Sequence, residues 1–192
     1  MSSVYSSRQF MKSAQLFQLL NALGLLGLSA SLAIAFYYQF WRHELPCPLC
    51  LLQRIGIISI GFGFLMNIRF GSRGLHYGLS IISAVISGIV SARQMFLHIA
   101  PGSDSYGSSL LGLHFYTWGV LASIGVIVFI AVLLIFESFH EKRQETTRIN
   151  TFGKIAITIF TLLIAANLLS VFLECGFSQC PDNPTTYQFL PL

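Results

Sequence analysis

The residues of this chain best able to do chemistry are its four cysteines, which fall into two closely spaced pairs. Cys47 and Cys50 have the C-x-x-C spacing of catalytic dithiols, which closes a small disulfide ring and lets one sulfur be a low-pKa thiolate. Cys175 and Cys180 form the second pair. Four cysteines allow three pairings, and the spacing favours one disulfide within each pair. Thiol–disulfide exchange is therefore the first chemistry that the sequence predicts.

Arg54 follows Cys50 by four residues and is expected on the same face of a helix. Cys50 falls at the expected start of that helix, where free N–H groups and the helix dipole favour a thiolate. A thiolate that attacks a quinone ring develops negative charge on the quinone oxygens, and a buried guanidinium would stabilise that charge. The pattern predicts electron transfer from a dithiol to a lipid-soluble quinone, with Cys50 as the reactive sulfur. The alternative for Arg54 is a side chain that snorkels to the lipid headgroups.

Arg93 and His98 are further candidates for quinone binding, near the outer end of the third apolar stretch. His98 could stabilise a reduced carbonyl oxygen or anchor the helix at the membrane interface. Arg93 has the same two interpretations as Arg54, a quinone-binding residue or a side chain that snorkels to the lipid headgroups, since it too lies inside an apolar stretch.

The elements that must position these residues are set by a strongly apolar composition. The chain has 192 residues, of which 54% are hydrophobic and only 9% are charged, and its mean hydropathy is +0.71. A core of this length could not hide so much apolar surface, so lipid must be part of the solvent. The pI near 9.0 does not indicate nucleic-acid binding, because lysine and arginine occur in short groups between apolar runs.

Five apolar stretches are each close to the ~20 residues that a helix needs to cross a bilayer. Backbone polar groups in lipid must be satisfied within the segment, so these stretches predict helices. Arg8, Lys12 and Ala33-Ile34-Ala35 resemble a cleavable secretory signal, but the apolar run is too long for one and is interpreted as an uncleaved first helix. The prediction is an all-α integral membrane protein, one domain over 1–192, with helices at about 14–40, 51–68, 75–100, 116–136 and 155–173.

Basic residues indicate the orientation of this five-helix bundle. Placing the N-terminus in the cytoplasm leaves only Arg42 in an outer loop, which agrees with the positive-inside rule. The C-terminus and the segments 41–50, 101–115 and 174–192 are then outside, and so are all four cysteines. Thiols in such an oxidising compartment become disulfides. The residues assigned to the inner side are Arg8, Lys12, Arg69, Arg73, Lys142, Arg143, Arg148 and Lys154.

Three motifs resemble the disulfide bond formation protein B (DsbB) family, the quinone-reducing oxidases of the bacterial inner membrane that recharge the periplasmic thiol oxidase DsbA. The resemblance implies an active site on the periplasmic face, ubiquinone or menaquinone as electron acceptor, Arg54 at the quinone, and Cys50 as the nearest sulfur. The motifs are Pro46-Cys47-Pro48-Leu49-Cys50-Leu51-Leu52-Gln53-Arg54, Ser91-Ala92-Arg93-Gln94 with Leu97-His98, and more weakly Gly112-Leu113-His114-Phe115-Tyr116-Thr117-Trp118.

The second cysteine pair departs from the family pattern. Four-helix members carry it in the outer loop between the third and fourth spans, whereas here 101–115 contains no cysteine. A fifth span instead places Cys175 and Cys180 in an outer tail. By analogy of position they would exchange with a DsbA-like thioredoxin-fold partner and be reoxidised by Cys47 and Cys50. The alternative is a disulfide that only braces the tail.

Two other classes of function use the same cysteines. Four thiolates from C-x2-C and C-x4-C could bind zinc, although this leaves Arg54 unexplained and needs reduced thiols in an oxidising compartment. A structural membrane protein with bracing disulfides would have an inert C-x-x-C. Within enzymes, a quinone-epoxide reductase of the vitamin K type would run electrons in the opposite direction.

Overall fold

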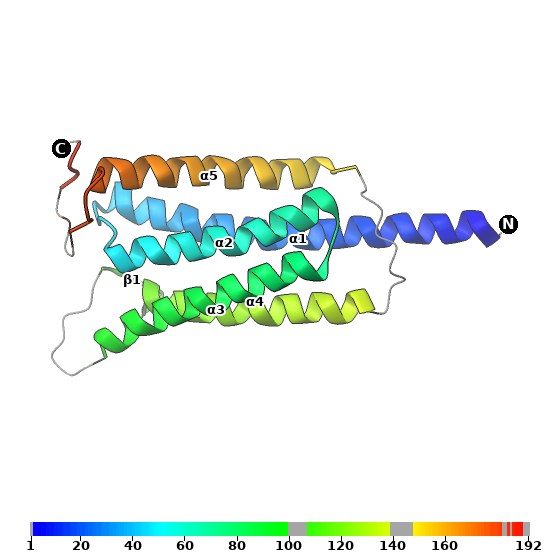
Figure 1. Ribbon diagram of the computed structural model, residues 1–192, viewed down its shortest axis with the longest axis horizontal. Coiled ribbons are helices and arrows are strands. Elements are labelled where there is room, and N and C mark those ends of the chain that lie inside the picture. Colours follow the sequence, from blue (N-terminus) through cyan, green and yellow to red (C-terminus); the bar gives the residue numbers. More distant parts are fainter. Residues whose placement is uncertain (1, 100–106, 139–147, 182–183, 185, 190–192) are drawn as a thin grey trace.

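A computed structural model of the chain describes residues 2–99, 107–138, 148–181, 184 and 186–189. Within these ranges there are five helices and one small hairpin (Figure 1). Each helix contains a stretch long and apolar enough to cross a membrane. The predicted all-α fold with five spans is thereby confirmed. The elements are α1 (Ser2–Trp41), α2 (Pro48–Phe70), α3 (Gly74–Leu97), β1 (Ser109–Leu110), β2 (Leu113–His114), α4 (Phe115–Ser138) and α5 (Thr151–Cys175).

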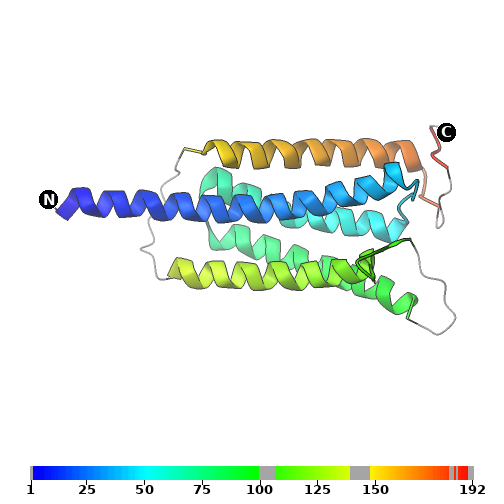
Figure 2. The ribbon, with the colours of Figure 1, turned by 180° about the vertical axis from the view of Figure 1, so that it is seen from behind.

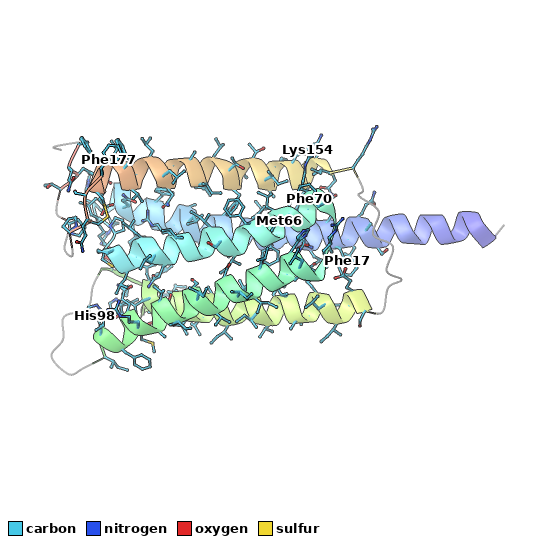
Figure 3. The ribbon with its side chains drawn as sticks, in the orientation of Figure 1. Phe17, Met66, Phe70, His98, Lys154 and Phe177 are labelled. Carbon is cyan, nitrogen blue, oxygen red and sulfur yellow. A yellow bond between two sulfur atoms is a disulfide. The ribbon has the colours of Figure 1, made fainter. Side chains whose placement is uncertain are left out.

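The five helices lie side by side and alternate in direction along the chain (Figures 1 and 2). One end of the bundle therefore gathers the ends of α1, α3 and α5 with the starts of α2 and α4. This end holds both cysteine pairs, and we call it the disulfide end. His98 and Phe177 lie there, whereas Phe17, Phe70 and Lys154 lie toward the other end (Figure 3).

Packing brings α3 between α2 and α4, and α1 between α2 and α5. Leu25, Leu32, Phe64 and Ile130 are buried in the shared core, whereas many large apolar side chains of α4 and α5 face outward. Such outward apolar surface is what a helix in lipid presents. Phe160 of α5 lies against Gly61 so closely that a Cβ at Gly61 would overlap its ring. The fifth helix is therefore seated directly on the core.

The start of α2 is set by a proline and a cysteine. Pro48 occupies the first turn, where its missing N–H costs nothing, and Cys47 is the N-cap in extended conformation. The helix thus begins three residues before the expected start at Leu51, which places Cys50 inside its first turn. The third helix was expected to end at about residue 100, whereas α3 ends at Leu97, and Ala100 itself lies outside the described residues. The fifth was expected to end at about 173, whereas α5 continues to Cys175.

A hairpin covers part of the disulfide end. β1 and β2 pair antiparallel across a two-residue turn in which Leu111 and Gly112 both have positive φ. Trp118 Nε1 donates a hydrogen bond to the Leu110 carbonyl at 2.9 Å, and Ser108 donates to the Glu44 carboxylate through both its backbone N–H and its hydroxyl. These bonds tie the hairpin to α4 and to the α1–α2 loop. The sequence predicted this segment only as an outer loop.

Candidate active site

The Cys47–Cys50 pair forms a disulfide at the first turn of α2. The Cys50 backbone N–H donates to Cys47 Sγ at 3.2 Å, so a sulfur serves as the cap of the helix. Cys47 is buried, whereas Cys50 is partly exposed. An N–H group of the first turn is therefore aimed at a sulfur of the pair, which favours negative charge there.

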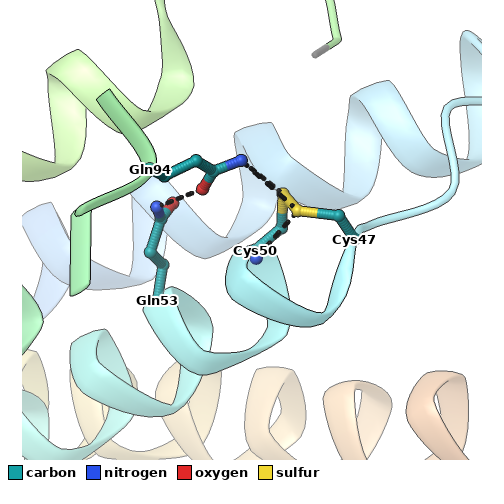
Figure 4. The surroundings of a disulfide bond; sticks show 4 residues. All are labelled: Cys47, Cys50, Gln53 and Gln94. Carbon is teal, nitrogen blue, oxygen red and sulfur yellow. Dashed lines mark hydrogen bonds between the residues drawn. A yellow bond between two sulfur atoms is a disulfide. The ribbon is translucent and has the colours of Figure 1, made fainter. Parts of the chain in front are cut away.

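A glutamine pair holds the other side of this disulfide (Figure 4). Gln94 of α3 donates from Nε2 to Cys47 Sγ at 3.3 Å, and the same nitrogen lies 3.6 Å from Cys50 Sγ. Gln53 of α2 donates to Gln94 Oε1 at 2.7 Å, which fixes the orientation of the Gln94 amide. An N–H group facing both sulfurs would stabilise a thiolate on either one. The sequence analysis quoted both glutamines within the motifs but assigned them no role.

A largely apolar cavity of about 330 Å³ lies beside the disulfide, between α1, α2, α3 and α4. Cys50, Arg54 and Gln94 contribute to its wall, and Cys47 does not. The hairpin and Glu44 border it at the disulfide end, and Tyr116 and Trp118 add aromatic rings. Such a site, apolar with a few convergent polar groups, has the character of a binding site for a small, mostly apolar molecule.

Arg54 is buried at the cavity wall and is firmly held. Its Nη1 donates to Gln39 Oε1 at 2.7 Å and its Nη2 to the Ala35 carbonyl at 3.2 Å. Its guanidinium carbon lies 5.0 Å from the centre of the Phe36 ring, a cation–π contact. With 6% of its surface exposed, Arg54 does not have the geometry of a snorkelling side chain.

Behind Arg54, a polar cluster joins α1, α5 and the tail. Gln39 donates from Nε2 to Ser170 Oγ at 2.7 Å and to Tyr187 Oη at 3.0 Å. Glu174 is completely buried nearby and interacts electrostatically with Arg54. Burial raises the pKa of Tyr187 above its usual value near 10, although the hydrogen bond from Gln39 opposes this shift, so the hydroxyl stays protonated at neutral pH. No sequence pattern predicted this cluster.

Arg93 and His98 lie farther from the cavity than Arg54. Arg93 is exposed on α3, and neither residue is among the described side chains that line the cavity. His98 is half-buried, and its ring stacks on Tyr116, a lining residue, with ring centres 5.7 Å apart. The structure therefore brings His98 to the site only through Tyr116 and does not bring Arg93 to it.

Cys175 and Cys180 form the second disulfide, at the end of α5. Cys175 is 2% exposed, and Cys180 is more open. The tail then folds back, because the Phe189 N–H donates to the Leu173 carbonyl at 3.2 Å and the Phe189 ring stacks on Phe172. Both disulfides therefore lie at the same end of the bundle.

The cysteines are joined as two separate disulfides and do not form a four-sulfur cluster. Among the described residues, no group of three or more His, Cys, Asp or Glu side chains could hold a metal ion. The zinc alternative therefore gains no support from the geometry.

An all-α bundle of membrane-crossing helices, with a C-x-x-C disulfide and a buried arginine at one apolar cavity, defines a membrane protein with a redox-active cysteine pair. Residues 17–106 match the sequence profile of the family described as "Disulfide bond formation protein DsbB". This segment of the chain matches the DsbB family, which confirms the resemblance. The segment includes Cys47, Cys50, Arg54 and Gln94, whereas α4, α5 and the tail lie beyond it.

Curated relatives named "Disulfide bond formation protein B" agree with this assignment. The protein of Marinobacter nauticus is 40% identical over 77 residues, which cover 38% of this chain and 46% of the relative. That of Nitrosomonas eutropha is 37% identical over 79 residues (39% and 49%), and that of Chromobacterium violaceum is 31% identical over 104 residues (50% and 63%). The chain spans about half the length of the first two relatives. No solved structure matches it.

Proposed function

We propose that this protein is an inner-membrane thiol–disulfide oxidoreductase that reoxidises a periplasmic, DsbA-like thioredoxin-fold protein and passes the electrons to a membrane quinone, ubiquinone or menaquinone. The observation that carries the proposal is that Cys50 and Arg54 line the same apolar cavity, with the Gln94 amide facing the sulfurs. A quinone accepts two electrons and two protons. Here the protein would supply the electrons from Cys50 and a cationic hydrogen-bond donor from Arg54.

The proposed steps use the two disulfides in turn. A thiolate of the partner opens the Cys175–Cys180 disulfide, and the resulting dithiol is reoxidised by the Cys47–Cys50 disulfide. Cys47 and Cys50, now reduced, would give two electrons to the quinone and close their disulfide again, and the two protons that the dithiol loses balance the two that the quinol gains. Gln94 and the Cys50 N–H group stabilise the thiolate between these steps. Both disulfides lie at the same end of the bundle, which supports exchange between the two pairs.

The direct test is turnover of the purified protein with a reduced thioredoxin-fold oxidase and a soluble ubiquinone. We expect one quinol to form for every two partner thiols that disappear, that is, one quinol per partner disulfide formed. Cys50→Ser should abolish quinol formation. If the wild-type protein forms no quinol, the cysteines are structural and the proposal is wrong.

The proposed periplasmic position of the active site makes a topology prediction. A reporter that is active only outside the cytoplasm should work when fused after Leu192 and fail when fused near Lys142, because Arg69, Arg73, Arg148 and Lys154 lie at or beside the helix ends opposite the disulfides. Reporter activity and reporter abundance are measured together for each fusion. The reverse pattern would put the cysteines in a reducing compartment and contradict the oxidase function.

A further inference from the structure

Glu174 is a buried acid that the proposed electron transfer does not use. It lies in the last turn of α5, directly before Cys175, and none of its surface is exposed. Neither carboxylate oxygen has a hydrogen-bond partner in the described part of the chain. Burying a carboxylate without a hydrogen-bond partner costs free energy. Its charged form therefore depends on a positive charge nearby.

That opposite charge is Arg54. Two ionisable groups interact electrostatically with Glu174 from the neighbouring elements, Arg54 of α2 and Tyr187 of the tail, and the tyrosine is neutral. The Glu174 oxygens do not bond the guanidinium directly, so the attraction acts across a gap. Charges in a protein interior are little screened and influence each other over several ångströms.

Arg54 does not depend on Glu174 for its position. Its hydrogen bonds to Gln39 and to the Ala35 carbonyl, together with the Phe36 ring, already fix the guanidinium at the cavity wall. These partners are neutral, so they orient Arg54 without reducing its charge. The distinct contribution of Glu174 is therefore a negative charge on the side of Arg54 that faces α5.

We propose that Glu174 tunes the quinone site through Arg54: its carboxylate offsets part of the positive potential at the cavity and so limits how tightly quinone oxygens are held. This inference rests on the proposed function. A fully uncompensated guanidinium would bind electron-rich oxygens more strongly and would slow release of the quinol. Glu174 lies outside the family match at 17–106, so the fifth helix brings this adjustment to a site built by α1–α4.

The test measures quinone binding without turnover. Trp118 lines the cavity, and Trp41→Phe leaves it as the only tryptophan of the chain. The oxidised full-length protein in detergent is titrated with a short-chain ubiquinone, and quenching of Trp118 fluorescence gives Kd. We expect Glu174→Gln to lower Kd roughly three- to tenfold, with a parallel fall in the KM for quinone.

Three further variants separate charge from structure. Glu174→Asp keeps the negative charge and should leave Kd near the wild-type value, whereas Glu174→Met removes the charge with an apolar side chain and should act like Glu174→Gln. Glu137→Gln makes the same substitution near the far end of α4 and should change nothing. If Glu174→Gln does not fold, Glu174→Met decides the question.

The outcomes distinguish two failures. An unchanged or raised Kd in the charge-removing variants, with normal binding by the wild-type protein, overturns the role of Glu174 alone. No quinone binding by the wild-type protein overturns the proposed function itself.

Discussion

Replacement of both Cys175 and Cys180 by serine is expected to lower oxidation of the thioredoxin-fold partner by roughly two orders of magnitude or more, while quinone binding stays at its wild-type level. The reason is that the partner's electrons would enter at the tail and reach Cys47 and Cys50 only by disulfide exchange. The measurement is the rate of partner oxidation at matched protein concentration, alongside the Kd for quinone. Near-normal partner oxidation would show that the first pair reacts with the partner directly.

The single variants identify the sulfur that the partner attacks. Cys175 is 2% exposed and Cys180 is more open, so the partner should attack Cys180. This is tested in the reverse direction with the oxidised partner: the Cys180 thiolate of Cys175→Ser should attack the partner's disulfide and form a mixed disulfide, with release of one partner thiol, and Cys175 is no longer present to displace the partner from Cys180. Cys180→Ser should trap much less. A disulfide that only braces the tail would give a different result: stability falls by about 2 to 4 kcal/mol and Cys47 and Cys50 continue to cycle.

Replacement of Arg54 by methionine should raise the KM for quinone by roughly 10- to 100-fold, which corresponds to loss of a charged hydrogen-bond donor worth about 1.5 to 3 kcal/mol. The Cys47–Cys50 disulfide should still form, since Gln94 and the helix cap hold it independently. Steady-state kinetics at varied quinone, with thiol titration of the same samples, measure both effects.

Arg93→Met is the matched control for this experiment. It removes the same charge from an exposed position outside the described cavity wall, and its kinetics should match those of the wild-type protein. An unchanged KM in Arg54→Met would contradict quinone binding by Arg54. An equal rise in both variants would point to a general effect of charge in the bundle.

The sequence predicted the parts of this protein that depend on local pattern. Hydropathy alone locates five helices, because each span must satisfy its backbone within itself. The four-residue step from Cys50 to Arg54 predicts a shared face, and both residues line the cavity. Periodicity was less informative for Arg93, since a basic residue near a helix end can face either the bundle or the outside. The packing of α3 between α2 and α4 leaves Arg93 exposed.

The remainder of the site depends on which helices are neighbours. Gln94 meets Cys47 only because α3 packs on α2, and Gln39 meets Tyr187 across 148 positions of sequence. Isolated glutamines or a glutamate in an apolar helix carry no signal of their partners. The hairpin was missed for a simpler reason: strands of two residues are too short to show alternation.

Cys47 is both the N-cap of α2 and one half of the disulfide. The stability of the first turn of α2 and the redox equilibrium of the cysteine pair are therefore thermodynamically linked. A thiolate accepts an amide N–H more strongly than a disulfide sulfur does, so α2 is better capped when the pair is reduced. By thermodynamic linkage, whatever the helix gains from that cap shifts the couple toward the reduced form and makes the disulfide a stronger oxidant. A cap worth about 1 kcal/mol corresponds to roughly 20 mV for a two-electron couple. Folding of the first turn thus contributes to the driving force for taking electrons.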